Sequence, residues 1–217
     1  MDKSRPKIKT VISELWDTYK YLIIICAVIA AALLYMLFKA ISTDSPDLRI
    51  LVAGESYMDE DSAALASDIC SGLTNDLNGD GKTVVEFLQL TAQQKLTQDG
   101  EFMYESGMMT RFNTEVNTCS SLIYIVDEAY YKLLCENSML APLSSIFNDI
   151  PDGAFDDYGF LYGALSLSTL DGFDKLKPDS YICFRRMPLE NEIQYVDTET
   201  YQAALELFKS LVTLPAE

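Results

Sequence analysis

Side-chain oxygens recur at every second position of one short, polar loop. Asp76, Asn78 and Asp80 stand at positions 1, 3 and 5 of this loop, and its sixth residue is a glycine. This is the first half of an EF-hand-type calcium loop, in which the seventh residue, here Lys82, contributes its backbone carbonyl. The second half is missing, because position 12 is Phe87 instead of an acid. The sequence therefore leaves two interpretations open: a weak calcium site, or a plain Asn-Gly/Asp-Gly turn between a helix and a strand.

Histidine is absent from the sequence. Its absence excludes Ser-His and Cys-His nucleophile pairs, imidazole bases and the zinc sites that contain histidine. Carboxylate chemistry such as glycoside hydrolysis stays open, with candidate acids at Asp127, Glu128, Asp156 and Asp157. In so acidic a chain such residues usually form a solvated face, so an enzyme is the alternative interpretation.

Four cysteines lie beyond the first apolar run, at Cys70, Cys119, Cys135 and Cys183. None belongs to a C-x-x-C pair, and each has apolar neighbours in a predicted helix or strand. Cysteine in such surroundings behaves as a small core residue. We therefore expect buried free thiols, although an even number of cysteines also permits disulfides.

The segment 152–160 mixes aromatic residues with carboxylates. This composition suits a recognition loop for a cationic or sugar ligand. It equally suits an irregular loop whose aromatic residues cover the core, and we favour that second interpretation.

The elements that position these residues follow from hydrophobic periodicity. Apolar residues at every fourth position, Leu65, Ile69, Leu73 and Leu77, indicate the first helix, and short β-branched runs indicate strands. Strands are predicted over 48–53, 83–90, 122–126, 160–167 and 181–185, and helices over 61–77, 101–119, from 127 onward and 198–212. Strand and helix alternate three times, which is typical of parallel sheets with crossover helices. The predicted fold class is α/β, with a mainly parallel sheet of about five strands flanked by helices.

An uncharged run without Gly or Pro occupies residues 21–38. With its flanks it reaches the ~20 residues that a helix needs to cross the hydrocarbon core of a bilayer. We therefore predict a transmembrane helix at 21–41. A cleaved signal peptide is the competing interpretation, but its apolar core is normally only about 7–15 residues long.

Charge sets the expected orientation of this helix. Five basic residues precede the run and only Lys39 follows it closely. The positive-inside rule then places residues 1–20 in the cytoplasm, and beyond a linker at 42–47 it places one domain, 48–217, outside. Residues 1–42 contain six basic and three acidic residues, and the whole chain carries −17, so the remainder carries −20. A domain this acidic repels phosphate backbones, which argues against nucleic acid as a partner.

Two stretches resemble known proteins. The run from Ser121 to Leu143, Ser-Leu-Ile-Tyr-Ile-Val-Asp-Glu to Ala-Pro-Leu, followed by the Tyr-Gly pair at 162, resembles extracellular solute-binding proteins of the type 2 periplasmic-binding class. The layout also resembles membrane-anchored extracytoplasmic proteins of clostridial Gram-positive bacteria: a basic N-terminus, Trp-Asp-x-Tyr-Lys-Tyr before the span, Pro-Asp-Leu after it and an Asn-Gly-Asp-Gly-Lys loop.

The first resemblance implies one lobe-like α/β domain. True solute-binding proteins close two lobes on a ligand, and residues 48–217 are too few for two such lobes. No ligand residues are therefore carried over from that class.

Together these observations predict a membrane-tethered extracytoplasmic binding or interaction module that is not an enzyme. We expect an unidentified protein or small-molecule partner to bind at the carboxyl ends of the strands, where open α/β sheets form their crevices. The alternatives are a carboxylate-dependent cell-wall hydrolase and an accessory subunit of a membrane complex.

Overall fold

The computed structural model describes residues 19–22, 24–26, 28–36, 45–91, 95–96, 102–103, 106–188 and 196–215. The chain divides into two compact units, Met1–Asp44 and Ser45–Glu217. In the first unit the helix Tyr19–Met36 has a mean hydropathy of 2.1, so it is long and apolar enough to cross a membrane. At 1.5 Å per residue, its 18 residues extend about 27 Å. The remainder of the predicted span, 37–41, and positions 42–44 of the predicted linker lie outside the described residues.

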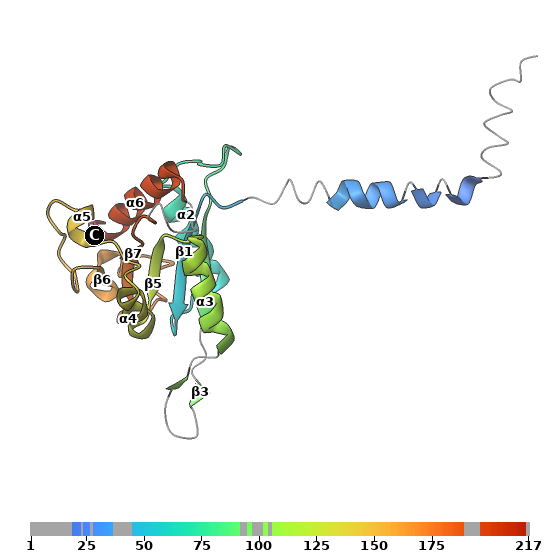
Figure 1. The fold of residues 1–217 in the computed structure, drawn as a ribbon. Helices are drawn as coiled ribbons and strands as arrows, with labels where there is room; N and C mark the ends of the chain where they lie inside the picture. The colour runs from blue at the N-terminus through green and yellow to red at the C-terminus, as the bar shows by residue number, and fades with distance from the viewer. Residues whose placement is uncertain are drawn as a thin grey trace, which may run out of the picture. The chain divides into compact units, whose positions relative to one another are not determined.

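The second unit is built on a five-stranded sheet in the order β2-β1-β5-β7-β6 (Figure 1). These strands are β1 (Leu48–Gly54), β2 (Val85–Thr91), β5 (Ile123–Val126), β6 (Gly159–Leu161) and β7 (Tyr181–Phe184). β1 pairs in parallel with both β2 and β5, whereas β7 is antiparallel to β5 and β6 is antiparallel to β7. The sheet is therefore mixed, and the predicted mainly parallel arrangement is not confirmed. Two short strands, β3 (Lys95–Leu96) and β4 (Phe102–Met103), form a separate antiparallel pair.

The departure from parallel pairing comes from the segment between β6 and β7. The predicted strand 160–167 ends at Leu161, and the chain continues through two 3₁₀ turns, Tyr162–Ala164 and Ser166–Thr169. The Tyr162 hydroxyl donates to the Phe173 carbonyl at 2.7 Å, and Gly163 N donates to the Pro178 carbonyl at 2.8 Å. This compact connection contains no crossover helix, so β7 returns antiparallel to its neighbours.

Helices cover both faces of the sheet (Figure 1). On one face lie α2 (Glu60–Ser71) and α6 (Thr198–Val212), and on the other lie α3 (Ser106–Thr118) and α4 (Glu128–Glu136). A further short helix, α5, occupies Leu143–Ile146. Side chains of β1 alternate between the two cores, with Ile50 and Val52 in one and Leu51 and Ala53 in the other. The three layers explain why β1 is buried nearly throughout.

Helix α2 packs through a different face from the one that its leucines indicate. The sequence predicts a helix over 61–77, but α2 ends at Ser71. Ile69 and Leu77 of the predicted stripe pack against the core, whereas Leu65 and Leu73 are 42% and 38% exposed. The buried positions are the small residues Ser62, Ala66 and Cys70. Gly172 lies so close to the backbone of α2 that a Cβ there would stand 3.0 Å from Ala66 N and from Ser62 O. Only a small-residue face permits this approach, so close backbone packing decides which face is buried.

Candidate functional site

The strand order creates a switch point at the carboxyl ends of β1 and β5. From β1 the chain crosses through α2 to β2 on one side, and it later returns through α3 to β5 on the other side. Open α/β sheets form their ligand crevices at such points. A hollow of about 320 Å³ lies there, and we call it the carboxyl-edge crevice. Its lining residues are Glu55, Asp127, Glu128, Ala129, Lys177, Asp179 and Tyr181.

Asp127, in the wall of this crevice, is held by backbone hydrogen bonds. It is the N-cap of α4, and its Oδ1 accepts hydrogen bonds from Ala129 N and Tyr130 N, both at 3.1 Å. Gly54 ends β1 with φ +119°, and a Cβ at Gly54 would collide with the Asp127 carboxylate. The glycine is therefore required both by its backbone conformation and by the neighbouring carboxylate.

Lysines pair with two other carboxylates of the crevice. Lys177 forms an ion pair with Glu55, and Lys132 forms one with Glu128 at 2.5 Å. The hydrogen bond to Glu55 raises the pKa of Lys177, and the hydrogen bond to Glu128 raises the pKa of Lys132. Both lysines therefore stay charged; the Lys132–Glu128 pair is largely exposed to solvent, and the Lys177–Glu55 pair is partly exposed.

A buried pair of serines joins two walls of the crevice. The hydroxyls of Ser56, just after β1, and Ser180, just before β7, lie 2.9 Å apart. Ser56 Oγ also accepts a hydrogen bond from Lys177 N at 3.2 Å. These contacts hold the loops that carry Glu55 and Asp179 in fixed positions.

Aromatic rings line a second hollow of about 250 Å³, which we call the aromatic pocket. The rings of Tyr131 and Tyr181 stack at 4.6 Å with an interplanar angle of 12°, and Phe155 meets Tyr181 edge-on at 4.9 Å. The Tyr131 hydroxyl donates to Asp156 Oδ1 at 2.5 Å. Burial, followed by this bond to the carboxylate, raises the pKa of Tyr131. The loop 152–160 thus supplies Phe155 and Asp156 to the wall of a pocket.

Carboxylates predicted as candidate acids gather around these two hollows. Asp127 and Glu128 line the crevice, and Asp156 lines the aromatic pocket, whereas Asp157 lines neither. Asp127 caps a helix, Glu128 pairs with Lys132, and Asp156 also accepts Tyr158 N at 2.8 Å. Each of these three carboxylates therefore takes part in contacts that hold the local structure.

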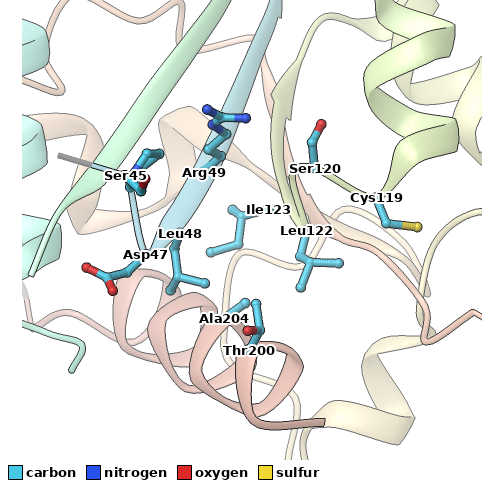
Figure 2. A pocket seen from close by; sticks show the side chains of 11 residues that line it. Ser45, Asp47, Leu48, Arg49, Cys119, Ser120, Leu122, Ile123, Thr200 and Ala204 are labelled. Atoms are coloured by element: carbon cyan, nitrogen blue, oxygen red, sulfur yellow. The ribbon is translucent and has the colours of Figure 1, made fainter. Parts of the chain in front are cut away.

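A third hollow, of about 270 Å³, lies at the opposite edge of the sheet (Figure 2). Its walls include Leu48 and Arg49 at the start of β1, Ile123 at the start of β5 and Ala204 of α6. Arg49 pairs with Glu86 at 2.5 Å, so its charge is already balanced. We call this hollow the amino-edge pocket.

Asp47, which also lines the amino-edge pocket, ties the beginning of the unit to the loop after α2. Its Oδ1 accepts hydrogen bonds from Leu77 N at 2.8 Å and from Asn78 N at 3.0 Å. Its Oδ2 accepts one from Val84 N at 2.8 Å. The predicted linker 42–47 therefore ends in residues that belong structurally to the domain.

The predicted calcium loop closes on its own backbone. Asp76 accepts Gly79 N at 2.7 Å and Gly81 N at 2.8 Å through its two oxygens. Asn78 Oδ1 accepts Asp80 N, and Asp80 Oδ1 accepts Lys82 N, both at 2.9 Å. This is the hydrogen-bonding pattern of successive Asx turns, which can form without a cation.

Calcium binding by this loop stays a prediction. Across the described ranges no group of three or more His, Cys, Asp or Glu is placed to hold a metal ion. The predicted ligand set contains only two carboxylates, so that finding does not test it. A calorimetric titration with millimolar calcium would test the site: no heat of binding, and no difference between the unsubstituted protein and Asp80→Ala, would rule it out.

The cysteines of the domain occupy the positions expected of small core residues. Cys70, Cys119 and Cys183 are buried thiols, and Cys135 is half-buried in the wall of the aromatic pocket. Burial raises the pKa of the Cys70 thiol to about 12 and that of Cys183 well above its ordinary value. These two thiols are therefore protonated and unreactive at neutral pH.

No protein-family model, curated protein or solved structure matches this chain. The geometry alone must therefore indicate a function. Sequence reasoning missed Glu55, Lys177, Asp179 and Tyr181 as lining residues of the crevice. Glu55 could have been found, because it follows directly on the glycine that ends the first buried strand. The other three could not, since their place depends on the antiparallel return of β7.

Proposed function

We propose that this chain is a membrane-tethered extracytoplasmic binding module that is not an enzyme. The tether is the apolar helix Tyr19–Met36 with its uncharged continuation, and the basic residues before it orient the N-terminus to the cytoplasm. The acidic domain then stands on the outer side of a plasma membrane. Its ligand or partner binds at the carboxyl-edge crevice.

One observation carries the proposed binding role. The crevice at the switch point is open to solvent. The carboxylates of Asp127, Glu128 and Asp156 lie around it and the adjoining aromatic pocket, and each takes part in a helix cap, an ion pair or hydrogen bonds. A rigid, charged hollow without histidine fits recognition, because recognition needs a fixed surface and no proton transfer.

A crevice-filling substitution tests the binding role. Ala129 is exposed in the first turn of α4 and lines the crevice, so Ala129→Trp places a large ring in the hollow without disturbing the core. The intact protein, purified from its native membranes in mild detergent, should retain a bound molecule or partner that mass spectrometry detects. Ala129→Trp should lose it.

The matched control is Gln202→Trp, which adds the same ring at an exposed position of α6. It should retain whatever the unsubstituted protein retains. Equal retention by the Ala129→Trp variant, or release of glycan fragments from cell wall by the purified protein, would contradict the proposal.

A further inference from the structure

We propose that the carboxyl-edge crevice and the aromatic pocket form one site for an organic cation, an ammonium group carried on an apolar body. The inference rests on the proposed function and names the chemical class of the ligand. The two hollows share Glu128 and Tyr181 as lining residues, so they adjoin. One side offers carboxylates and the other offers aromatic rings.

The charge of the combined site favours a cation. Its lining contains two lysines, Lys132 and Lys177, against six carboxylates, those of Glu55, Asp127, Glu128, Glu136, Asp156 and Asp179. The site therefore carries four net negative charges. An anionic ligand would be repelled, whereas a cation is attracted and steered toward the hollow.

The two lysines show where a positive charge is stabilised. Glu128 is the main cause of the raised pKa of Lys132, and Tyr181 and Glu136 add to it. Glu55 has the same role for Lys177, with smaller contributions from Asp179 and Asp127. Each lysine ammonium thus occupies a position that a ligand ammonium could take.

Replacing such a lysine costs little free energy. The Lys132 and Glu128 side chains are 66% and 64% exposed, and the pair is an ordinary i,i+4 contact of α4. Exposed pairs of this kind contribute little to stability. A ligand cation can therefore form the ion pair with Glu128 in place of Lys132, whose side chain then swings out into the solvent.

The aromatic pocket accounts for the apolar body of the ligand. Phe155 is 54% exposed, although its ring meets Tyr131 and Tyr181 edge-on. Tyr131 and Tyr181 are only 3% and 8% exposed, so Phe155 presents the accessible ring. An alkyl or aryl group that packs on Phe155 would cover part of this ring, and the ring would attract the adjoining ammonium. The apolar contact is not available to a bare inorganic cation.

Three probes of the same shape test this inference. Benzylammonium, benzyl alcohol and benzoate differ mainly in charge, and calorimetry can measure their binding to the full chain in nanodiscs, with empty nanodiscs subtracted. We expect benzylammonium to bind about tenfold or more tightly than benzyl alcohol, and benzoate to show no binding. Equal affinity for the cation and the alcohol would overturn the proposal.

Matched variants locate the site. Glu128→Gln should weaken benzylammonium binding by about 3- to 10-fold, because it removes one carboxylate beside the ammonium. Glu206→Gln is the control, since Glu206 also pairs with a lysine, Lys209, on an exposed helix surface. Phe155→Ala should weaken binding of benzylammonium by about 3-fold or more. If Glu128→Gln behaved as Glu206→Gln does, the site would be elsewhere and the inference would be wrong.

The inference and the proposed function fail separately. If Ala129→Trp releases a co-purified molecule but no probe discriminates by charge, the binding role stands and the cationic ligand class is wrong. If benzylammonium binds as expected but the native protein retains the same molecules with and without the tryptophan, the ligand class stands and the binding role in the membrane is contradicted.

Discussion

Single carboxylates hold much of this domain together. Asp59, Asp127 and Asp197 cap three helices, and Asp47 and Asp76 accept backbone N–H groups in the loop region before β2. A side-chain oxygen that satisfies an otherwise unpaired N–H stabilises the local chain. Acidic residues that look like a solvated surface in the sequence therefore have specific structural partners.

Substitution of Asp47 should have the largest effect among the loop carboxylates. Asp47→Ala leaves three backbone N–H groups, those of Leu77, Asn78 and Val84, without their acceptor. We expect the free energy of unfolding of the domain to fall by about 2 kcal/mol, measured by urea denaturation. Asp80→Ala removes an acceptor from one backbone group, that of Lys82, and should cost less than half as much. Equal losses would show that the three bonds of Asp47 are not the cause.

At the level of elements, the junction of β1 and α4 sets the shape of the crevice. Gly54 and the Asp127 cap lie against each other where two parallel strands end. The serine pair behind them fixes the loop before β7. Three elements that are distant in the sequence are thus held together at one edge of the sheet.

Gly54→Ala should lower the melting temperature of the domain clearly. The added methyl group meets the Asp127 carboxylate, and alanine is strained at φ +119°. We expect a loss of about 2 kcal/mol or more, measured by thermal unfolding. Gly107→Ala is the matched control, because nothing lies within 4 Å of its Cβ position in α3, and it should be neutral or slightly stabilising. A neutral Gly54→Ala would mean that the junction is adaptable.

Helices and strands with a regular pattern of apolar residues were predictable from the sequence. Those whose bounds or buried face depend on tertiary contacts were not. The last helix was predicted over 198–212, and α6 has these bounds, because its apolar stripe is regular and Asp197 caps it. The strand expected at 160–167 was wrong beyond Leu161, since Tyr162 and Gly163 turn the chain through bonds to distant carbonyls. The buried face of α2 was also missed, because it depends on the approach of Gly172.

The candidate site was predictable only in part. The sequence names Asp127, Glu128, Asp156 and Asp157 as candidate acids, and the structure places the first three, but not Asp157, in the walls of the two hollows. A binding site at the strand ends stays a prediction. The joining of the crevice to an aromatic pocket did not, because Tyr131, Phe155 and Tyr181 meet only through tertiary packing.

At the scale of the whole molecule, charge and hydropathy predict which side of the membrane the domain occupies. Gln202→Cys places a thiol on the exposed surface of α6, and Lys3→Cys places one in the basic N-terminal segment. In intact cells, a membrane-impermeant maleimide should label the first variant and should label the second only after the cells are permeabilised. The unsubstituted chain gives the background from its own cysteines. The reverse pattern would show that the domain is cytoplasmic.

The two ends of β1 lead to different features of the protein, the apolar helix and the carboxyl-edge crevice. Ser45 and Asp47, at its start, lead back toward the apolar helix, and Glu55, at its end, lines the crevice. Tension between the membrane and a captured partner would run lengthwise along this strand. β1 is paired in register with β2 over seven residues and with β5 over four, so these bonds would be sheared together instead of opening one at a time. With the proposed tether at one end and the proposed partner at the other, β1, which lies between β2 and β5, would resist load through both sets of bonds.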